Sequence, residues 1–213
     1  MSQSPFVITV SRQLGSGGAC LGKRVAESLG ILYLDREILS EAAKHFQLTE
    51  GDLEELDEKT SSFWRSFLKA GTYITPEIYI DPPVYVPTDQ EFFQVEAKII
   101  ERVAREDSAV IIGRGGSFVL RNHPRHLSVF LHADLAFRLK RVRERFNLSE
   151  KEARELIEQT DKERARYLQT FTGRDWKDVR QYHLAIDTGA VSLEEATELV
   201  LACAKSRFGL TAV

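Results

Sequence analysis

The sequence predicts an α/β domain built on a parallel sheet, and three observations support this fold class. The first is the N-terminal stretch at residues 6–30, which has the pattern strand, glycine loop, helix. The second is a series of short apolar runs that alternate with amphipathic segments, as in parallel sheets covered by helices. The third is that charged residues follow several of these runs, at the carboxyl ends of strands where such sheets bind ligands.

The N-terminal stretch begins with an apolar run, Phe6 to Val10, that predicts a buried strand. Three glycines follow within four residues, at Gly15, Gly17 and Gly18, and an amphipathic helix is predicted directly after them. Glycine permits positive φ angles and lets backbone N–H groups face a ligand. The helix N-terminus adds a partial positive charge at the same place. The natural ligand is a phosphate, and the alternative is an ordinary strand-to-helix turn that happens to be rich in glycine.

The glycine loop can be aligned with the phosphate-binding pattern GxxxxGK[ST] in two registers. One register starts at Gly17 and uses Lys23, but that lysine would lie about one turn too far inside the helix, so we disfavour it. The other register spans residues 12–19 and has the right loop length. There Gly18 replaces the phosphate-binding lysine, and Ala19 replaces the magnesium-binding hydroxyl.

Four further apolar segments predict the other strands, at residues 31–34, 109–113, 127–131 and from 185 onward. Helices are predicted at about 36–46, near 92–106 and from about residue 149. Because the carboxyl ends of parallel strands lie along one edge of the sheet, charged residues at these ends should converge there. Four of the predicted strands end in such residues: Arg12, Asp35, Arg114 and Asp187.

The overall composition narrows the function classes. A length of 213 residues suits one α/β domain, and a formal net charge of −3 argues against a nucleic-acid binder. Two cysteines, Cys20 and Cys203, form no metal-binding pattern and indicate a reducing compartment. No apolar run is long enough to cross a bilayer. We therefore expect a soluble, cytoplasmic protein with no membrane partner and no metal site made of its own side chains.

Six segments together make the sequence resemble the cytidylate kinase-like family, a divergent branch of the nucleoside monophosphate kinases. They occur in the family's order over nearly the whole chain: VSRQLGSGG (10–18), LYLDREIL (32–39), VIIGRGG (110–116), VFLHADLAFRLKRV (129–142), DKERARY (161–167) and LAIDT (184–188). The resemblance implies a P-loop NTPase-like fold with a parallel sheet of about five strands. It also implies nucleotide substrates, with ATP and Mg²⁺ as cofactors.

The resemblance further implies a single domain, residues 1–213, with three parts. The core would comprise about 1–45 and 95–213, an acceptor-binding insertion about 46–94, and a helical lid about 147–175. Residues 60–94 combine many aromatic side chains with four prolines. This segment would bind the acceptor, or else form a packing arm, for example in a homodimer.

The donor nucleotide would bind at the glycine loop. Backbone N–H groups of the loop would hold its β-phosphate, and these belong to Gly15, Ser16, Gly17, Gly18 and Ala19. Arg12 would supply part of the charge of the missing lysine, with a surface ion pair as its alternative role. By resemblance Asp187 would lie near the nucleotide base, with a helix cap as the alternative. Magnesium would be held mainly by phosphate oxygens and waters, assisted by Ser16 or Asp35.

The acceptor phosphate would be held by Arg114, which matches the arginine of the family's Gly-Arg-Asp motif. A charge directly after an apolar strand is costly unless it meets an anion. Gly115 stands where the relatives closest to true cytidylate kinases have the aspartate, so recognition of the pyrimidine ring cannot simply be transferred. Asp35 would orient the acceptor or a hydrated magnesium ion, and Arg36 would substitute for an arginine that cytidylate kinases carry a few residues later.

The predicted lid carries the remaining site residues. Ser149 and Glu152 form a capping box at the start of its helix. By resemblance, Arg164 and Arg166 would close on the transferring phosphoryl group and exclude water, and Asp161 on the same helix would contact substrate. The alternative is a solvated, highly charged helix.

The basic run RLKRVRER (138–145) also has more than one interpretation. Leu139 and Val142 stand at helical spacing within it, so the simplest is a helix with one buried stripe. Contact with nucleic acid and a position bordering the donor's base are the other two.

These observations favour a kinase-like phosphotransferase that moves the γ-phosphoryl group of ATP to CMP or dCMP. The catalytic candidates are Arg114, Arg164, Arg166 and Asp35, and the substrate-binding candidates are Arg36, Arg114 and Asp161. Because the loop lysine, its neighbouring hydroxyl and the acceptor aspartate are absent, two alternatives stay open. One is a nucleotide- or phosphometabolite-binding protein with little transfer activity, and the other is a kinase for a different small acceptor.

Overall fold

The centre of the computed structural model, which describes residues 4–35, 39 and 90–210, is a five-stranded sheet. The strand order is β2-β3-β1-β4-β5, and every neighbouring pair is parallel. This confirms the predicted fold class. The strands are β1 (Val7–Arg12), β2 (Leu32–Leu34), β3 (Ala109–Ile112), β4 (His126–His132) and β5 (Leu184–Asp187).

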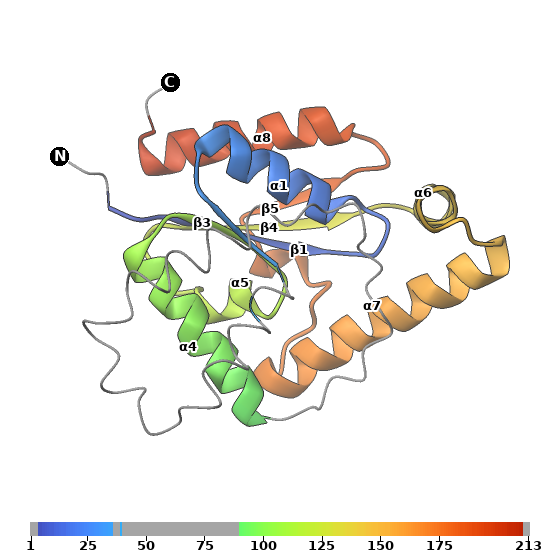
Figure 1. Cartoon of the computed structure of the whole chain (residues 1–213), viewed down its shortest axis with the longest axis horizontal. Helices are drawn as coiled ribbons and strands as arrows, with labels where there is room; N and C mark the ends of the chain where they lie inside the picture. The colour runs from blue at the N-terminus through green and yellow to red at the C-terminus, as the bar shows by residue number, and fades with distance from the viewer. Residues whose placement is uncertain (1–3, 36–38, 40–89, 211–213) are drawn as a thin grey trace.

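Helices cover both faces of the sheet (Figure 1). On one face lie α1 (Gly18–Leu29) and α8 (Leu193–Phe208), and on the other lie α4 (Gln90–Glu106) and the short α5 (Gly116–Val119). Past the carboxyl ends of the strands the chain forms α6 (Leu135–Phe146), and α7 (Glu150–Thr172) then runs back toward α4. A short 3₁₀ turn, η2 (Val179–Gln181), leads into β5.

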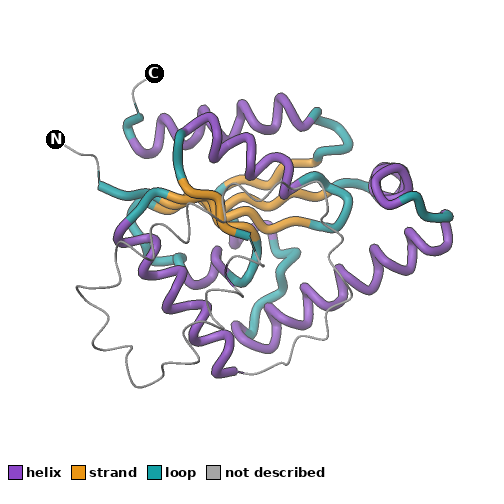
Figure 2. The backbone as a smooth tube through the Cα atoms, in the orientation of Figure 1, coloured by secondary structure: helices purple, strands orange, loops and turns teal. Residues whose placement is uncertain are grey.

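The core consists of two hydrophobic layers, one on each face of the sheet. Figure 2 shows the strands with helices on both sides of them. Successive side chains of a strand point to opposite faces. In β1, Ile8 and Val10 therefore pack with α1 and α8, whereas Val7 packs with α4. Because both faces are covered, the strand is a nearly continuous apolar run and its end is the first place where polar chemistry can occur.

The boundaries of α7 follow from its sequence. Ser149 and Glu152 form the predicted capping box, in which each side chain bonds the other residue's backbone N–H. The helix ends at Gly173, which adopts the left-handed conformation with φ 68°. With 23 residues it is about 35 Å long, so one continuous helix spans the width of the domain.

Some sequence predictions fall outside the described residues. They concern Arg36, the helix at 36–46 apart from residue 39, and residues 46–89 of the proposed insertion. The last residues assigned to that insertion, 90–94, belong to α4, which begins at Gln90. Of the helices that the structure describes, none combines the length and the apolar character needed to span a membrane.

Candidate functional site

The glycine loop occupies the turn between β1 and α1. The helix begins at Gly18, with Gly17 as its N-cap at φ 86°, so residues 12–19 span the whole turn. Lys23 lies more than one turn inside α1, and its ammonium group is 3.9 Å from the Glu27 carboxylate. The register that uses Lys23 therefore places no lysine at the loop.

Two of the loop glycines are required by close packing. A Cβ atom at Gly17 would lie 2.6 Å from a methyl group of Leu193 at the start of α8. A Cβ atom at Gly18 would lie 2.7 Å from both Cβ and Cγ of Arg12. Real Cβ atoms do not approach other carbon atoms so closely, so a side chain at position 18 and the stem of Arg12 exclude each other.

The backbone of the loop presents unpaired donors. The N–H of Ser16 bonds the Gln13 carbonyl oxygen at 3.2 Å. No oxygen of the residues described by the structure accepts a hydrogen bond from four other amides, those of Gly15, Gly17, Gly18 and Ala19. Successive amides that lack protein acceptors at a helix N-terminus form a binding site for an anion.

Thr188, directly after the end of β5, bonds the glycine loop. Its buried hydroxyl donates to the Ser16 carbonyl oxygen at 2.9 Å. The hydroxyl of Ser16 itself donates to the Gln13 carbonyl oxygen at 2.8 Å, so it stabilises the loop internally. The neighbouring Asp187 accepts a hydrogen bond from the Gly189 N–H at 2.9 Å, which makes it a cap of the turn after β5.

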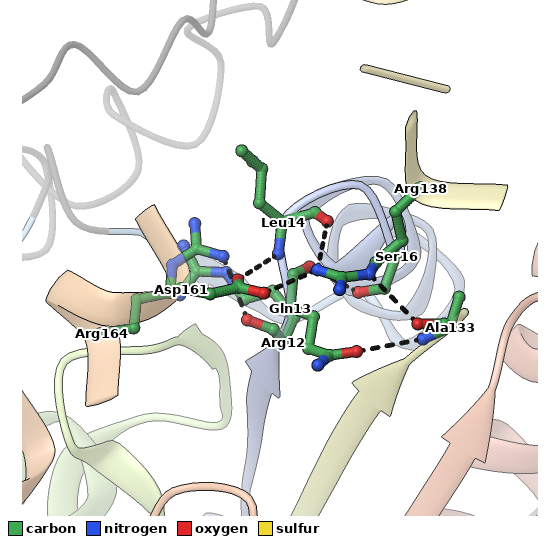
Figure 3. Close-up of polar contacts among 8 residues, drawn as sticks. All are labelled: Arg12, Gln13, Leu14, Ser16, Ala133, Arg138, Asp161 and Arg164. Atoms are coloured by element: carbon green, nitrogen blue, oxygen red, sulfur yellow. Dashed lines mark hydrogen bonds and ion pairs between the residues drawn. The ribbon is translucent and has the colours of Figure 1, made fainter. Parts of the chain in front are cut away.

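Two side chains of α7 reach the loop (Figure 3). Arg164 Nη1 donates to the carbonyl oxygen of Arg12 at 3.0 Å, and Asp161 Oδ1 accepts from the Leu14 N–H at 2.9 Å. The second oxygen of Asp161 is 2.6 Å from Nη1 of Arg138 on α6. Both oxygens of Asp161, which the sequence analysis proposes as a substrate contact, are thus bonded within the protein.

Arg166 does not join this group. It is exposed, and it lies two residues beyond Arg164, which corresponds to a rotation of about 200° around the helix. Its role at the phosphoryl group stays a prediction.

Arg114 lies just beyond β3 in the left-handed conformation, with φ 52°. Its Nε donates to Glu96 Oε1 at 2.7 Å, and the two side chains are 7% and 0% exposed. The other oxygen of Glu96 accepts from the Tyr167 hydroxyl at 2.9 Å. The Tyr167 ring also lies 5.1 Å from the Arg114 guanidinium carbon, in cation–π geometry. An arginine held on two sides has a fixed orientation.

Arg12 and Asp35 extend the site across the ends of β1, β2 and β3. The Arg12 guanidinium lies over Gly113, since a Cβ atom there would overlap it. Burial, and next the Asp35 carboxylate, raise the pKa of the Tyr33 phenol, while the Arg12 guanidinium opposes the shift. Both charges therefore lie within electrostatic range of one buried phenol, and the strand ends converge as predicted.

Sequence analysis missed Arg138, Glu96 and Tyr167 as site residues. The signal was present for two of them, because Arg138 is four positions before the buried Val142, and Glu96 is four before the buried Ile100. A charged residue on the apolar side of a helix indicates a buried partner.

A parallel sheet with a glycine loop between its first strand and its first helix, and with Arg138 and Arg164 bonded to the backbone of that loop, is typical of kinase-type P-loop proteins. The model of the cytidylate kinase-like family matches residues 7–190, so the chain belongs to that family. The resemblance stated from the sequence is confirmed, and the chain is a member of a family of kinase-like phosphotransferases.

The chain is also similar to individual proteins in sequence and in fold. The chain is similar to a cytidylate kinase of Pyrococcus horikoshii, with 29% identity over 204 residues that cover 95% of this chain and 90% of that protein. It also resembles the solved structure of an uncharacterized protein from Eubacterium ventriosum, with TM-score 0.71 and 25% identity over 95% of this chain and 99% of that one. A gluconokinase from Sinorhizobium meliloti shares the fold, with TM-score 0.51 and 17% identity over 97% and 95% of the two chains.

Proposed function

We propose that this protein is a nucleoside monophosphate kinase that transfers the γ-phosphoryl group of ATP to CMP or dCMP. The observation that carries the proposal is the group of four loop amides without acceptors among the described residues, with Arg164 of α7 against the same loop. Phosphoryl transfer depends mainly on positioning and on neutralisation of charge. Amides, a helix N-terminus and guanidinium groups provide both.

The residues present fit the phosphates of ATP better than they fit the metal. The amides of Gly15, Gly17, Gly18 and Ala19 would hold the β-phosphate. Position 19 has no hydroxyl, and the hydroxyl of Ser16 already donates within the loop. Mg²⁺ would therefore be held by phosphate oxygens and waters, with the Asp35 carboxylate at the end of β2 as the protein's contribution. When bound, it would neutralise charge on the transferring group.

Arg12 is the proposed replacement for the missing lysine. Its stem lies against Gly18, where the side chain of a lysine would begin, and this contact requires glycine there. The loop cation is thus carried by the last residue of β1 instead of the first residue of α1. Guanidinium also suits phosphate, because it can donate two parallel hydrogen bonds.

Arg114 is the proposed ligand of the acceptor's phosphate, oriented by Glu96 and Tyr167. The similarity to a protein named cytidylate kinase supports a cytidine nucleotide as acceptor. Gly115 departs from the family motif, and a Cβ atom there would be strained by φ 68° and would lie 3.2 Å from the Phe93 ring. Recognition of the base would therefore have to come from other residues, Arg36 and the proposed insertion at 46–94 among them.

The experiment is an ADP-release assay with ATP, Mg²⁺ and a panel of acceptors: CMP, dCMP, UMP, AMP, GMP and gluconate. Turnover confined to CMP and dCMP supports the proposal. Thermal stabilisation by ATP without turnover would favour the nucleotide-binding alternative, which the absent side chains at Gly18 and Ala19 motivate. Turnover only with another acceptor would favour the third possibility.

A variant tests the role of Arg12. Arg12→Met should raise the KM for ATP by about tenfold to a hundredfold, because it removes a charge-assisted hydrogen bond to phosphate. Lys23→Met is the matched control, since it removes a cation from the same strand–loop–helix unit. Among the described residues, the Lys23 ammonium group pairs with the Glu27 carboxylate, on α1 and away from the loop. Unchanged affinity and turnover in the Arg12 variant would refute this assignment.

A further inference from the structure

Arg138 and Asp161 form a buried ion pair directly beside the glycine loop (Figure 3). Arg138 belongs to α6 and Asp161 to α7, and their side chains are 10% and 11% exposed. We infer that this is a positioning pair, in which Asp161 holds the donor loop and Arg138 cancels the charge that would otherwise repel the donor. The inference rests on the proposed function, because it requires a nucleotide phosphate at the loop.

The pair contacts both backbone polar groups of Leu14, its N–H and its carbonyl oxygen. Asp161 Oδ1 accepts from the Leu14 N–H at 2.9 Å, and Arg138 Nη1 lies 3.4 Å from the Leu14 carbonyl oxygen. Arg138 Nε also donates to the Ala133 carbonyl oxygen at 3.1 Å, which fixes its guanidinium at the start of α6. Two helices therefore hold the loop by the residue that precedes its first glycine.

The next loop residue, Gly15, packs against the backbone of α6 at Arg138. A Cβ atom at Gly15 would lie 2.9 Å from Cβ of Arg138 and 3.0 Å from its carbonyl oxygen, so the two backbones are in close contact. Ordering a residue costs conformational entropy, and glycine-rich segments lose the most. Because the loop is already ordered at Leu14 and Gly15, it loses less conformational entropy when an anion binds.

The charge of Asp161 gives the pair its second role. A carboxylate bonded to a loop amide lies next to the place where the donor phosphates would bind, and like charges in a poorly solvated site repel strongly. The Arg138 guanidinium, paired with that carboxylate at 2.6 Å, brings the net charge of the two side chains to zero. Removing either partner breaks the same contact. Loss of Arg138 leaves a negative charge beside the phosphates, whereas loss of Asp161 leaves a positive one.

This difference in sign provides the experiment. ATP affinity, by titration calorimetry, and thermal midpoints are measured for Arg138→Met, Asp161→Asn and the double variant. Asparagine keeps an oxygen for the Leu14 N–H, so Asp161→Asn removes mainly the charge. Arg138→Met should raise the Kd for ATP at least about tenfold, because at an effective dielectric near 20 one uncompensated charge about 12 Å from a phosphate charge already has that effect. Asp161→Asn should bind ATP at least as tightly as the wild type, and the double variant should lie between the two.

Two further variants serve as controls. Arg138→Lys keeps the charge and should stay within about threefold of the wild-type Kd, since only the fixed guanidinium geometry is lost. Arg143→Met removes an exposed ion pair that also links α6 to α7, with Glu150 at 3.8 Å, and should leave ATP affinity unchanged.

Equal loss of ATP affinity in both single variants, or loss of thermal stability without any change in ATP affinity, would overturn the inference. If Arg138→Met does not fold, the ATP affinities of Asp161→Asn and the double variant are compared instead. These two proteins differ only at Arg138, so the comparison tests the inference. Tighter ATP binding by Asp161→Asn supports the inference, and equal affinity overturns it. A wild-type protein that binds no ATP would instead refute the proposed function.

Discussion

Replacing Glu96 with glutamine should destabilise the whole domain. Glu96 is fully buried in α4, where it pairs with Arg114 and accepts a hydrogen bond from the Tyr167 hydroxyl. Glutamine has nearly the same volume, so no cavity forms and the change isolates the charge. The Arg114 side chain, 7% exposed, would then be buried without its carboxylate.

The magnitude follows from the burial of both partners. Breaking a buried ion pair by removing one partner costs about 3–5 kcal/mol, and we take the lower end because glutamine keeps one acceptor oxygen. Unfolding entropy of about 2.1 cal/mol/K per residue amounts to about 0.45 kcal/mol/K for a chain of 213 residues. A loss of about 3 kcal/mol therefore lowers the thermal midpoint by about 7 °C.

The assay is thermal unfolding followed by circular dichroism, with Glu106→Gln as the matched control. Glu106 lies on the same helix, and its Oε1 accepts from Arg102 Nε at 2.9 Å, a geometry close to that of the Glu96 pair. The Arg102 and Glu106 side chains are 18% and 30% exposed, so water compensates for the lost charge and the cost should be below about 1 kcal/mol.

The reasoning fails if the two variants melt at the same temperature. That result would mean that the buried guanidinium of Arg114 does not need the Glu96 carboxylate. A second readout applies if the protein is a kinase, because a mispositioned Arg114 should raise the KM for the acceptor more than the KM for ATP.

Two further predictions concern stability. Burial, and after it His183, lowers the pKa of His126 to about 3, so the unfolded chain binds a proton more readily than the folded one. The contribution of His126 to stability is then complete above about pH 6.5 and is lost as the pH falls toward 3, by about 2 kcal/mol between pH 6.5 and 5. Urea unfolding should show a flatter pH dependence for His126→Gln than for the wild type. An unchanged pH dependence would contradict this prediction. At Gly22, an added Cβ would overlap the Ile112 Cδ1 methyl group, so Gly22→Ala should cost about 1–3 kcal/mol. Adding Ile112→Val removes that methyl group and should restore part of the loss in the same urea titration, whereas additive losses would refute the packing argument.

The parts of the fold that the sequence predicted are those set by local spacing. The strand, glycine loop and first helix follow one another within 30 residues, and the capping box at Ser149 and Glu152 is complete within a single turn. The buried strands were recognisable because both faces of the sheet are covered, which makes them nearly continuous apolar runs. For such elements the neighbours in sequence are also the neighbours in space.

Strand ends are the part of the candidate site that the fold class alone could indicate. Arg12, Asp35 and Arg114 were proposed because a parallel sheet brings the ends of its strands together, whereas Arg164 was proposed from the family resemblance. Arg138 and Glu96 were missed because their partners are 23 and 18 residues away, and the fold alone brings these pairs together. Helical periodicity places Arg138 and Glu96 on the buried side of their helices, but it does not identify the counter-charge that each one meets.

The single helix α7 contacts both the glycine loop and the pair formed by Glu96 and Arg114. Asp161, Arg164 and Tyr167 are spaced three residues apart, so they lie along one side of the helix. The first two bond the donor loop, and the third bonds Glu96, which holds Arg114. A rigid helix cannot shift relative to the loop without also shifting relative to Glu96, because both sets of bonds start from the same backbone. We predict that occupation of either proposed phosphate site changes the affinity of the other through this helix, and by linkage the two effects on binding must be equal.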